Sequence, residues 1–172
     1  MRHSAGYTLV ELLVVIVIIG ITLTGAFAGY RTFNNRQIVT TSGKELLVAL
    51  RQVQAGASSG TKTPASCAGT QLVGHRIQAA AASLGKYTLT EVYASACNAG
   101  SNQYFIKDVI LPSTLHFSGA FTITFTGLSG GATLSGASPM TIRLCNNNCA
   151  NGAVNYSMSV SNTGSIQDLG TS

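Results

Sequence analysis

The sequence predicts an α+β fold in which one long N-terminal α-helix packs on antiparallel β-sheets. Residues 9–23 are apolar apart from one ionisable group, whereas the chain after Ser42 is rich in Gly, Ser, Thr and Asn and breaks into short strand-like pieces. Of the 172 residues, 45% are apolar and only 9% are charged. Because this composition is more hydrophobic than that of most water-soluble proteins, we expect part of the chain to contact lipid or other chains.

The apolar segment, residues 7–27, is long enough for a helix to cross the roughly 30 Å hydrocarbon core of a membrane. Arg2 on one side would keep that end in the cytoplasm, so a plain membrane anchor is one interpretation. A cleaved secretory signal is another, because Ala-Phe-Ala at residues 26–28 has the small-x-small form that signal peptidase accepts. Cleavage there would release a chain that begins at Gly29.

Glu11 argues against both interpretations. A carboxylate in an apolar span costs about 2.5 to 3.5 kcal/mol at the centre of a membrane and less near its end. Neither a secretory signal nor a simple anchor has a use for this group. We therefore treat Glu11 as a functional candidate.

The string GYTLVELLVVIVIIGI, residues 6–21, resembles the class III signal of type IV pilins and type II secretion pseudopilins. The resemblance implies that a prepilin peptidase, which is also the methyltransferase, cleaves after Gly6 and methylates the new amine of Tyr7. It also implies that Glu11, fifth in the mature chain, is required for assembly with other pilin subunits in a helical filament. The precursor would sit in the inner membrane and the product in an extracellular filament or a periplasmic pseudopilus.

Electrostatics supports this role for Glu11. Cleavage after Gly6 creates a positive amine at Tyr7, and in a bundle of parallel helices the Glu11 carboxylate of one subunit would neutralise the amine of a neighbour. The charge pair would then select an axial offset between subunits, as a buried polar residue fixes register in a coiled coil. Many family members carry a proline where this chain has Ala28. Because that proline is absent here, the sequence does not indicate where the helix would melt locally during assembly.

The second half of the predicted helix is amphipathic. An apolar stripe recurs at helical spacing, and no proline interrupts the chain before Pro64. The stripe consists of Val39, Gly43, Leu46, Leu47, Leu50 and Val53. Gly56 and the Ser-Ser-Gly at residues 58–60 provide a stop, so we expect one helix of about 45 to 50 residues. The predicted segments are a leader at 1–6, a transmembrane or filament-core helix at 7–28, an amphipathic half at 29–60 and a β-rich domain at 61–172.

Strand-like segments fill the remainder of the chain, and several alternate polar and apolar residues. We predict strands at residues 87–93, 103–109, 121–126, 140–145, 154–160 and 165–169. Turns are expected at 127–131, 146–148 and 162–164, the last in a hairpin. The run of alanines at 79–82 is expected to form a short helix or a loop.

The predicted β-rich domain resembles the H-type minor pseudopilins and related minor pilins, the GspH/FimT-like group. Three features carry the resemblance: residues 46–53 with Arg51 at the end of the helix, Ile-Leu-Pro at 110–112 before a strand, and the closing segment 160–166. The resemblance implies a structural subunit, most simply a minor pilin of a type IV pilus. The alternatives are a pseudopilin of a type II secretion system and a DNA-uptake minor pilin that binds DNA through exposed Lys and Arg.

The chain has four cysteines: Cys67, Cys97, Cys145 and Cys149. Their number is even and the N-terminal segment indicates export, so disulfides are favoured. Three pairings are open. A clip between Cys145 and Cys149 across the intervening Asn-Asn-Asn would leave Cys67 to pair with Cys97. Zinc is the competing interpretation, but there is no C-x-x-C and the histidines have no ligand spacing.

The sequence contains no catalytic constellation. His75 and His116 are isolated, no serine lies in G-x-S-x-G, and neither a P-loop nor a G-x-G-x-x-G segment occurs. We therefore expect no enzyme activity, no cofactor and no metal. The net charge of +5 is mild and no basic run is interleaved with aromatic residues, so a nucleic-acid partner has little support.

Overall fold

The computed structural model describes residues 8–63, 67, 69–80, 85–97, 100–127, 130–146, 149–150 and 152–172. The chain divides into two compact units, Met1–Gln37 and Ile38–Ser172. A single helix, α1 (Leu9–Ser59), begins in the first unit and ends in the second, and its 51 residues slightly exceed the expected length. By length and composition α1 is able to cross a membrane, and none of its most apolar stretch is buried within the chain.

The C-terminal end of α1 is closed by a glycine motif. Gly60 has a positive φ of 64°. The Gly60 N–H bonds to the carbonyl of Ala57 at 3.2 Å, and the Thr61 N–H bonds to that of Gly56 at 3.2 Å. This pair of bonds is a Schellman cap, which satisfies carbonyls that the last helical turn would otherwise leave open. The predicted stop therefore lies where the structure ends the helix.

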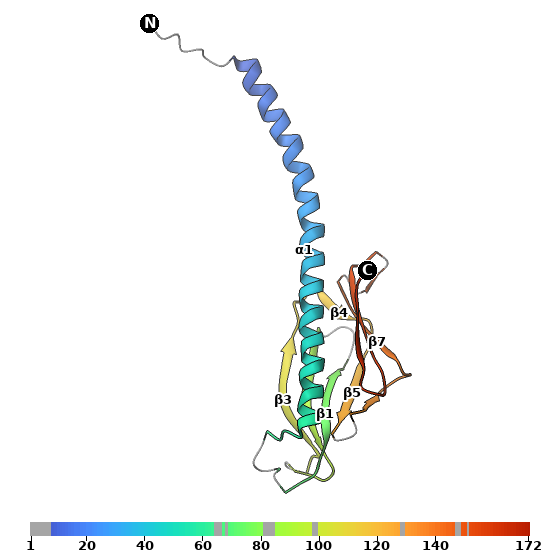
Figure 1. Cartoon of the computed structure of the whole chain (residues 1–172). Helices are drawn as coiled ribbons and strands as arrows, with labels where there is room; N and C mark the ends of the chain where they lie inside the picture. Colours follow the sequence, from blue (N-terminus) through green and yellow to red (C-terminus); the bar gives the residue numbers. More distant parts are fainter. Residues whose placement is uncertain are drawn as a thin grey trace. The chain divides into compact units, whose positions relative to one another are not determined.

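Two antiparallel sheets form the body of the second unit (Figure 1). One has the order β3-β2-β1-β5-β6, made of β1 (Leu72–Ala79), β2 (Lys86–Tyr93), β3 (Gln103–Ile110), β5 (Phe121–Thr126) and β6 (Ala132–Leu134). The other has the order β4-β7-β8-β9, made of β4 (Leu115–Phe117), β7 (Met140–Asn146), β8 (Asn155–Val160) and β9 (Ile166–Thr171). The predicted α+β class is thus confirmed.

The core of this unit lies between α1 and the inner faces of the sheets. All six residues of the predicted helical stripe are buried. They meet inward-facing side chains of both sheets, among them Ile77, Ile123, Leu144 and Met158, which have no exposed surface. The expected hairpin at 162–164 joins β8 to β9, and Gly164 occupies its turn with a φ of 84°.

Three strands were not predicted, and one of them is central. β1 pairs on one side with β2 and on the other with β5, and it overlaps at its last residue the run 79–82, where a loop or short helix was expected. Ala79, the first of the alanines, is its last residue. The expectation of a helix or loop from that position was therefore wrong at Ala79, and the alanines at 81–82 lie outside the described residues.

Candidate functional site

The N-terminus of α1 carries a capping box formed by Thr8 and Glu11. The Thr8 hydroxyl accepts the N–H of Glu11 at 3.3 Å, and the Glu11 Oε2 accepts the N–H of Thr8 at 3.4 Å. These reciprocal bonds satisfy two donors that the first helical turn leaves without partners. A carboxylate in this turn also interacts favourably with the positive end of the helix dipole. Glu11 therefore helps to start the helix.

The capping bonds use only one of the two oxygens of the Glu11 carboxylate. Both bonds from Thr8 reach Oε2, while Oε1 has no hydrogen-bond partner among the described residues. The first basic residue along the described part of α1 is Arg31, about 30 Å further at the 1.5 Å rise of a helix. Within its own chain, the side chain of Glu11 is thus exposed and far from the cations of this helix. It presents an open acceptor to a donor from outside the chain.

The helix around Glu11 presents an apolar surface. Its large side chains from Leu9 to Leu23 are each about half exposed or more, with Leu9 at 81% and Ile21 at 70%. The hydroxyls of Thr22 and Thr24 bond to carbonyls of their own helix at 2.7 to 3.0 Å. Since these polar groups are satisfied internally, this surface suits an apolar environment such as lipid or a bundle of helices.

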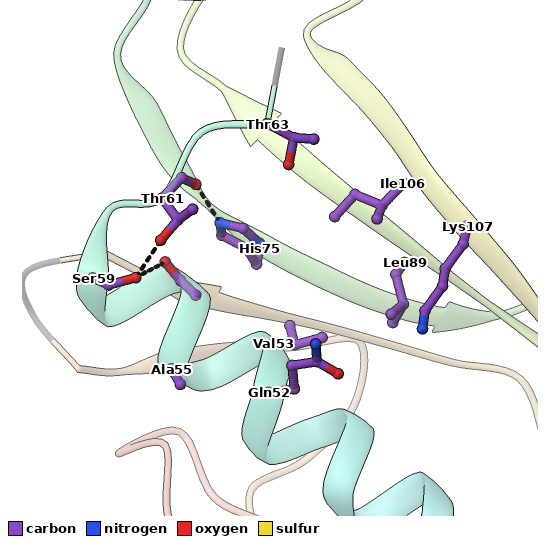
Figure 2. A pocket seen from close by; sticks show the side chains of 11 residues that line it. Gln52, Val53, Ala55, Ser59, Thr61, Thr63, His75, Leu89, Ile106 and Lys107 are labelled. Atoms are coloured by element: carbon purple, nitrogen blue, oxygen red, sulfur yellow. Dashed lines mark hydrogen bonds between the residues drawn. The ribbon is translucent and has the colours of Figure 1, made fainter.

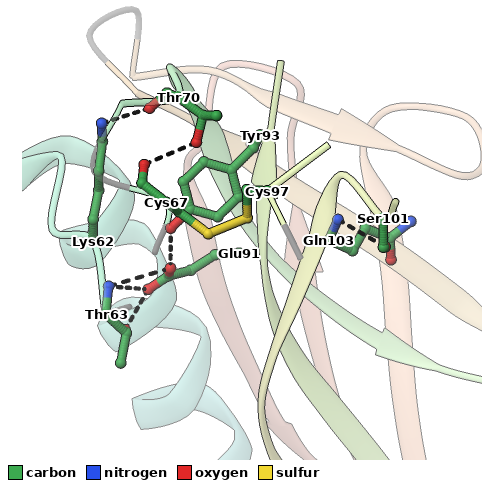
Figure 3. Close-up of a disulfide and its surroundings, with 9 residues drawn as sticks. All are labelled: Lys62, Thr63, Cys67, Thr70, Glu91, Tyr93, Cys97, Ser101 and Gln103. Atoms are coloured by element: carbon green, nitrogen blue, oxygen red, sulfur yellow. Dashed lines mark hydrogen bonds between the residues drawn. A yellow bond between two sulfur atoms is a disulfide. The ribbon is translucent and has the colours of Figure 1, made fainter. Parts of the chain in front are cut away.

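The other predicted site residues fall into two groups. Gly6 and Tyr7, the expected cleavage and methylation positions, lie outside the described residues. The cysteines are joined as Cys67–Cys97 and Cys145–Cys149, with Cα atoms 5.1 Å apart in each pair. The first bond, drawn in Figure 3, ties the connection after α1 to the connection between β2 and β3. The second joins the end of β7 to Cys149.

A buried carboxylate beside the first disulfide was missed by sequence reasoning. Glu91 in β2 has no exposed surface and accepts hydrogen bonds from the N–H and hydroxyl of Thr63 and, at 2.5 Å, from the hydroxyl of Tyr93 (Figure 3). Burial and the Glu91 contact raise the pKa of Tyr93. These bonds hold the segment after α1 against the sheet. The only signal in the sequence was a lone acid in an otherwise uncharged strand core.

No metal site is evident in the part of the chain that the structure describes. It contains no group of three or more His, Cys, Asp or Glu side chains placed to hold an ion. His75 is buried and its Nε2 lies 3.0 Å from the carbonyl oxygen of Thr61, while His116 lies in β4. The two histidines therefore do not come together in a shared site.

Comparison with known proteins identifies the N-terminal segment. Residues 1–27 match the prokaryotic N-terminal methylation motif. Neither a curated protein nor a solved structure matches the chain significantly. The motif indicates a type IV pilin-like prepilin, a class that is processed by prepilin peptidase and is generally structural rather than enzymatic.

Proposed function

We propose that this chain is a structural subunit, specifically a minor pilin, of a type IV pilus or a related filament. The observation that carries the proposal is the N-terminal methylation motif on a helix whose apolar surface is open and bears one acid, Glu11. In this proposal the peptidase removes residues 1–6 and methylates Tyr7. Residues 7–28 form the helix held first in the membrane and then in the filament core, residues 29–60 its amphipathic half, and residues 61–172 the exposed domain.

Assembly follows from the charge created by cleavage. The new amine of Tyr7 and the carboxylate of Glu11 are both costly in an apolar environment unless they are paired. Oε1 of Glu11, which has no hydrogen-bond partner among the described residues, offers an acceptor for the amine of a neighbouring subunit while Oε2 keeps its bonds to Thr8. Pairing between neighbours lowers the cost only at one axial offset, so it selects the register of the bundle.

Within the pilin-like proteins we assign the body to the GspH/FimT-like minor subunits. Three features support the assignment: Arg51 near the end of α1, Ile-Leu-Pro at 110–112 between β3 and β4, and the closing β8–β9 hairpin with Gly164 in its turn. The precursor would reside in the inner membrane before the subunit enters an extracellular filament.

Mass spectrometry of the mature N-terminus in the native host tests the processing step. We expect a chain that begins with N-methylated Tyr7. A chain that begins at Gly29 would instead identify a secretory signal, and one that retains Met1 would identify an uncleaved anchor. Either result would overturn the proposal.

A charge-neutral variant tests the role of Glu11. Glu11→Gln keeps a capping side chain but removes the charge, so a neighbour's amine would lose its partner in an apolar bundle. Breaking a buried pair costs about 3 to 5 kcal/mol, enough to lower incorporation into filaments more than a hundredfold. Glu45→Gln, at an exposed position later in the same helix, is the matched control and should incorporate like the parent. Equal incorporation of both variants would contradict the charge-pairing mechanism.

A further inference from the structure

A groove opens between α1 and the edge strand β3 in the second unit (Figure 2). Its volume is about 560 Å³. Val53 of α1, Leu89 of β2 and Ile106 of β3 provide apolar walls, and Lys107 and Thr63 add polar groups. All of these residues belong to the unit Ile38–Ser172, so the groove does not depend on how the N-terminal part of α1 is placed.

A bulge explains why two consecutive residues of β3 line the groove. Leu89 pairs with Lys107 and Thr90 pairs with Phe105, so Ile106 has no partner on β2. Side chains of a regular strand alternate between faces, whereas a bulge lets two neighbours share one face. Ile106 and Lys107 therefore place an apolar group and a cation side by side.

The strand beside the groove has an unpaired edge. β3 is eight residues long and is the terminal strand of its sheet, so about half of its main-chain groups point away from β2. Among the described residues, the main-chain groups of Gln103–Ile110 make no bond to other main-chain groups beyond the β2–β3 ladder, and the N–H of Gln103 bonds to the Ser101 hydroxyl at 3.1 Å. Phe105 and Ile110 on this strand are 55% and 80% exposed. Such an edge is a template for an added strand.

The charge of the groove selects the kind of strand. Among the described residues that line the groove, Lys107 is the only charged one, and none of them is an acid that could neutralise it. The neighbouring Asp108 is already bonded to Thr88 and Lys86 across the ladder. An antiparallel copy of β3 centred on this position would bring two Lys107 side chains together, which is unfavourable. The geometry thus disfavours a second copy and favours a strand that carries a carboxylate.

We propose that β3 and the groove bind an extended segment of a partner protein as an added strand, with an apolar side chain beside Ile106 and a carboxylate against Lys107. Main-chain bonds to β3 supply the attachment, and the groove and the lysine supply the selectivity. This interaction is separate from filament assembly through α1. It would connect the subunit to a protein that presents a free acidic strand.

Peptide binding to the full chain in detergent micelles tests this inference. The probe is a fluorescein-labelled octapeptide of alternating valine and threonine with one central glutamate, followed by anisotropy. A peptide with lysine in place of that glutamate, and one with N-methyl groups on alternate amides, are the controls. We expect the acidic peptide to bind about threefold more tightly than the basic one, because an exposed ion pair adds only modestly to affinity. The N-methylated peptide should lose binding.

Charge reversal in the protein locates the site. Lys107→Glu should exchange the preference between the acidic and basic peptides, whereas Lys44→Glu, an exposed lysine of α1 outside the groove, should leave it unchanged. The inference is wrong if the N-methylated peptide binds as well as the parent peptide, or if both variants behave alike. Concentration-dependent dimers that Lys107→Glu alters would also overturn it, since the occupant would then be a second copy.

Discussion

Gly43 of α1 lies directly against Tyr156 of β8. A Cβ atom built on Gly43 would lie 2.9 Å from the Cβ of Tyr156 and closer still to the Cγ and Cδ1 of its ring. Tyr156 is only 1% exposed, so its ring has little room to move aside. We predict that Gly43→Ala destabilises the unit Ile38–Ser172 even though alanine is the better helix former.

Two opposing effects determine how much Gly43→Ala changes the free energy of unfolding. Replacing glycine by alanine inside a helix gains about 0.8 to 1 kcal/mol. Overpacking a well-filled core costs about 1 to 3 kcal/mol, and here the clash with a buried ring places the cost at the upper end. The expected net loss is therefore about 1 to 2 kcal/mol, which lowers the melting temperature of a unit of this size by roughly 3 to 7 °C.

A double-variant cycle in urea, followed by circular dichroism, separates the two effects. In a Tyr156→Ala background the two ring contacts are absent and only the Cβ contact at 2.9 Å remains, so Gly43→Ala should destabilise the unit clearly less than it does in the parent. If Gly43→Ala destabilised both backgrounds equally, close contact with Tyr156 would not be the reason for glycine at this position.

Three further predictions concern the same unit. Replacing both cysteines of one disulfide by serine should lower the free energy of unfolding, as measured by thermal melts. The expected loss is about 3.5 kcal/mol for Cys67–Cys97, which spans 30 residues, and about 2 kcal/mol for Cys145–Cys149, which spans 4. Glu91→Gln should cost about 1.5 to 3 kcal/mol in urea unfolding, because three donors lose a charged acceptor. Burial raises the pKa of Tyr156 to about 12, above its ordinary value of 10. Its contribution to stability is therefore complete below pH 10 and lost between pH 10 and 12, by up to about 1.4 kcal/mol per pH unit, a loss that Tyr156→Phe should reduce.

The periodic spacing of apolar residues in the sequence predicted most of the secondary structure. The helical stripe repeats over four turns, and strands such as Phe121–Thr126 alternate apolar residues with threonine along the sequence. Both patterns persist because one face of each element meets the core. The Schellman cap was predictable for a different reason, since glycine is the residue that adopts a positive φ at little cost.

The missed strands lacked such patterns. β4 and β6 are three residues long, too short to show a period. β1 lies between two strands and includes Gly74, where a Cβ would collide with the carbonyl oxygen of Phe125, followed by the polar His75 and Arg76. Close backbone approach and partners brought from distant parts of the chain make this sequence a strand. Neither is visible in a local window.

Glu11 has one role that the structure shows and one that we propose. It forms a capping box with Thr8, and in the proposed assembly it also pairs with a neighbour's amine. The observed bonds use Oε2 and the proposed pair would use Oε1, so the two roles are compatible.

Three variants therefore separate these roles in a filament-incorporation assay. Glu11→Gln preserves a capping side chain and removes the charge. Thr8→Val removes the capping hydroxyl and preserves the charge, and Glu11→Ala removes the charge together with the capping bond to the Thr8 N–H. If charge pairing governs assembly, Glu11→Gln should fail as fully as Glu11→Ala while Thr8→Val retains incorporation, because a lost cap costs only about 1 kcal/mol. The opposite order, with Thr8→Val failing and Glu11→Gln assembling, would assign Glu11 to helix initiation alone.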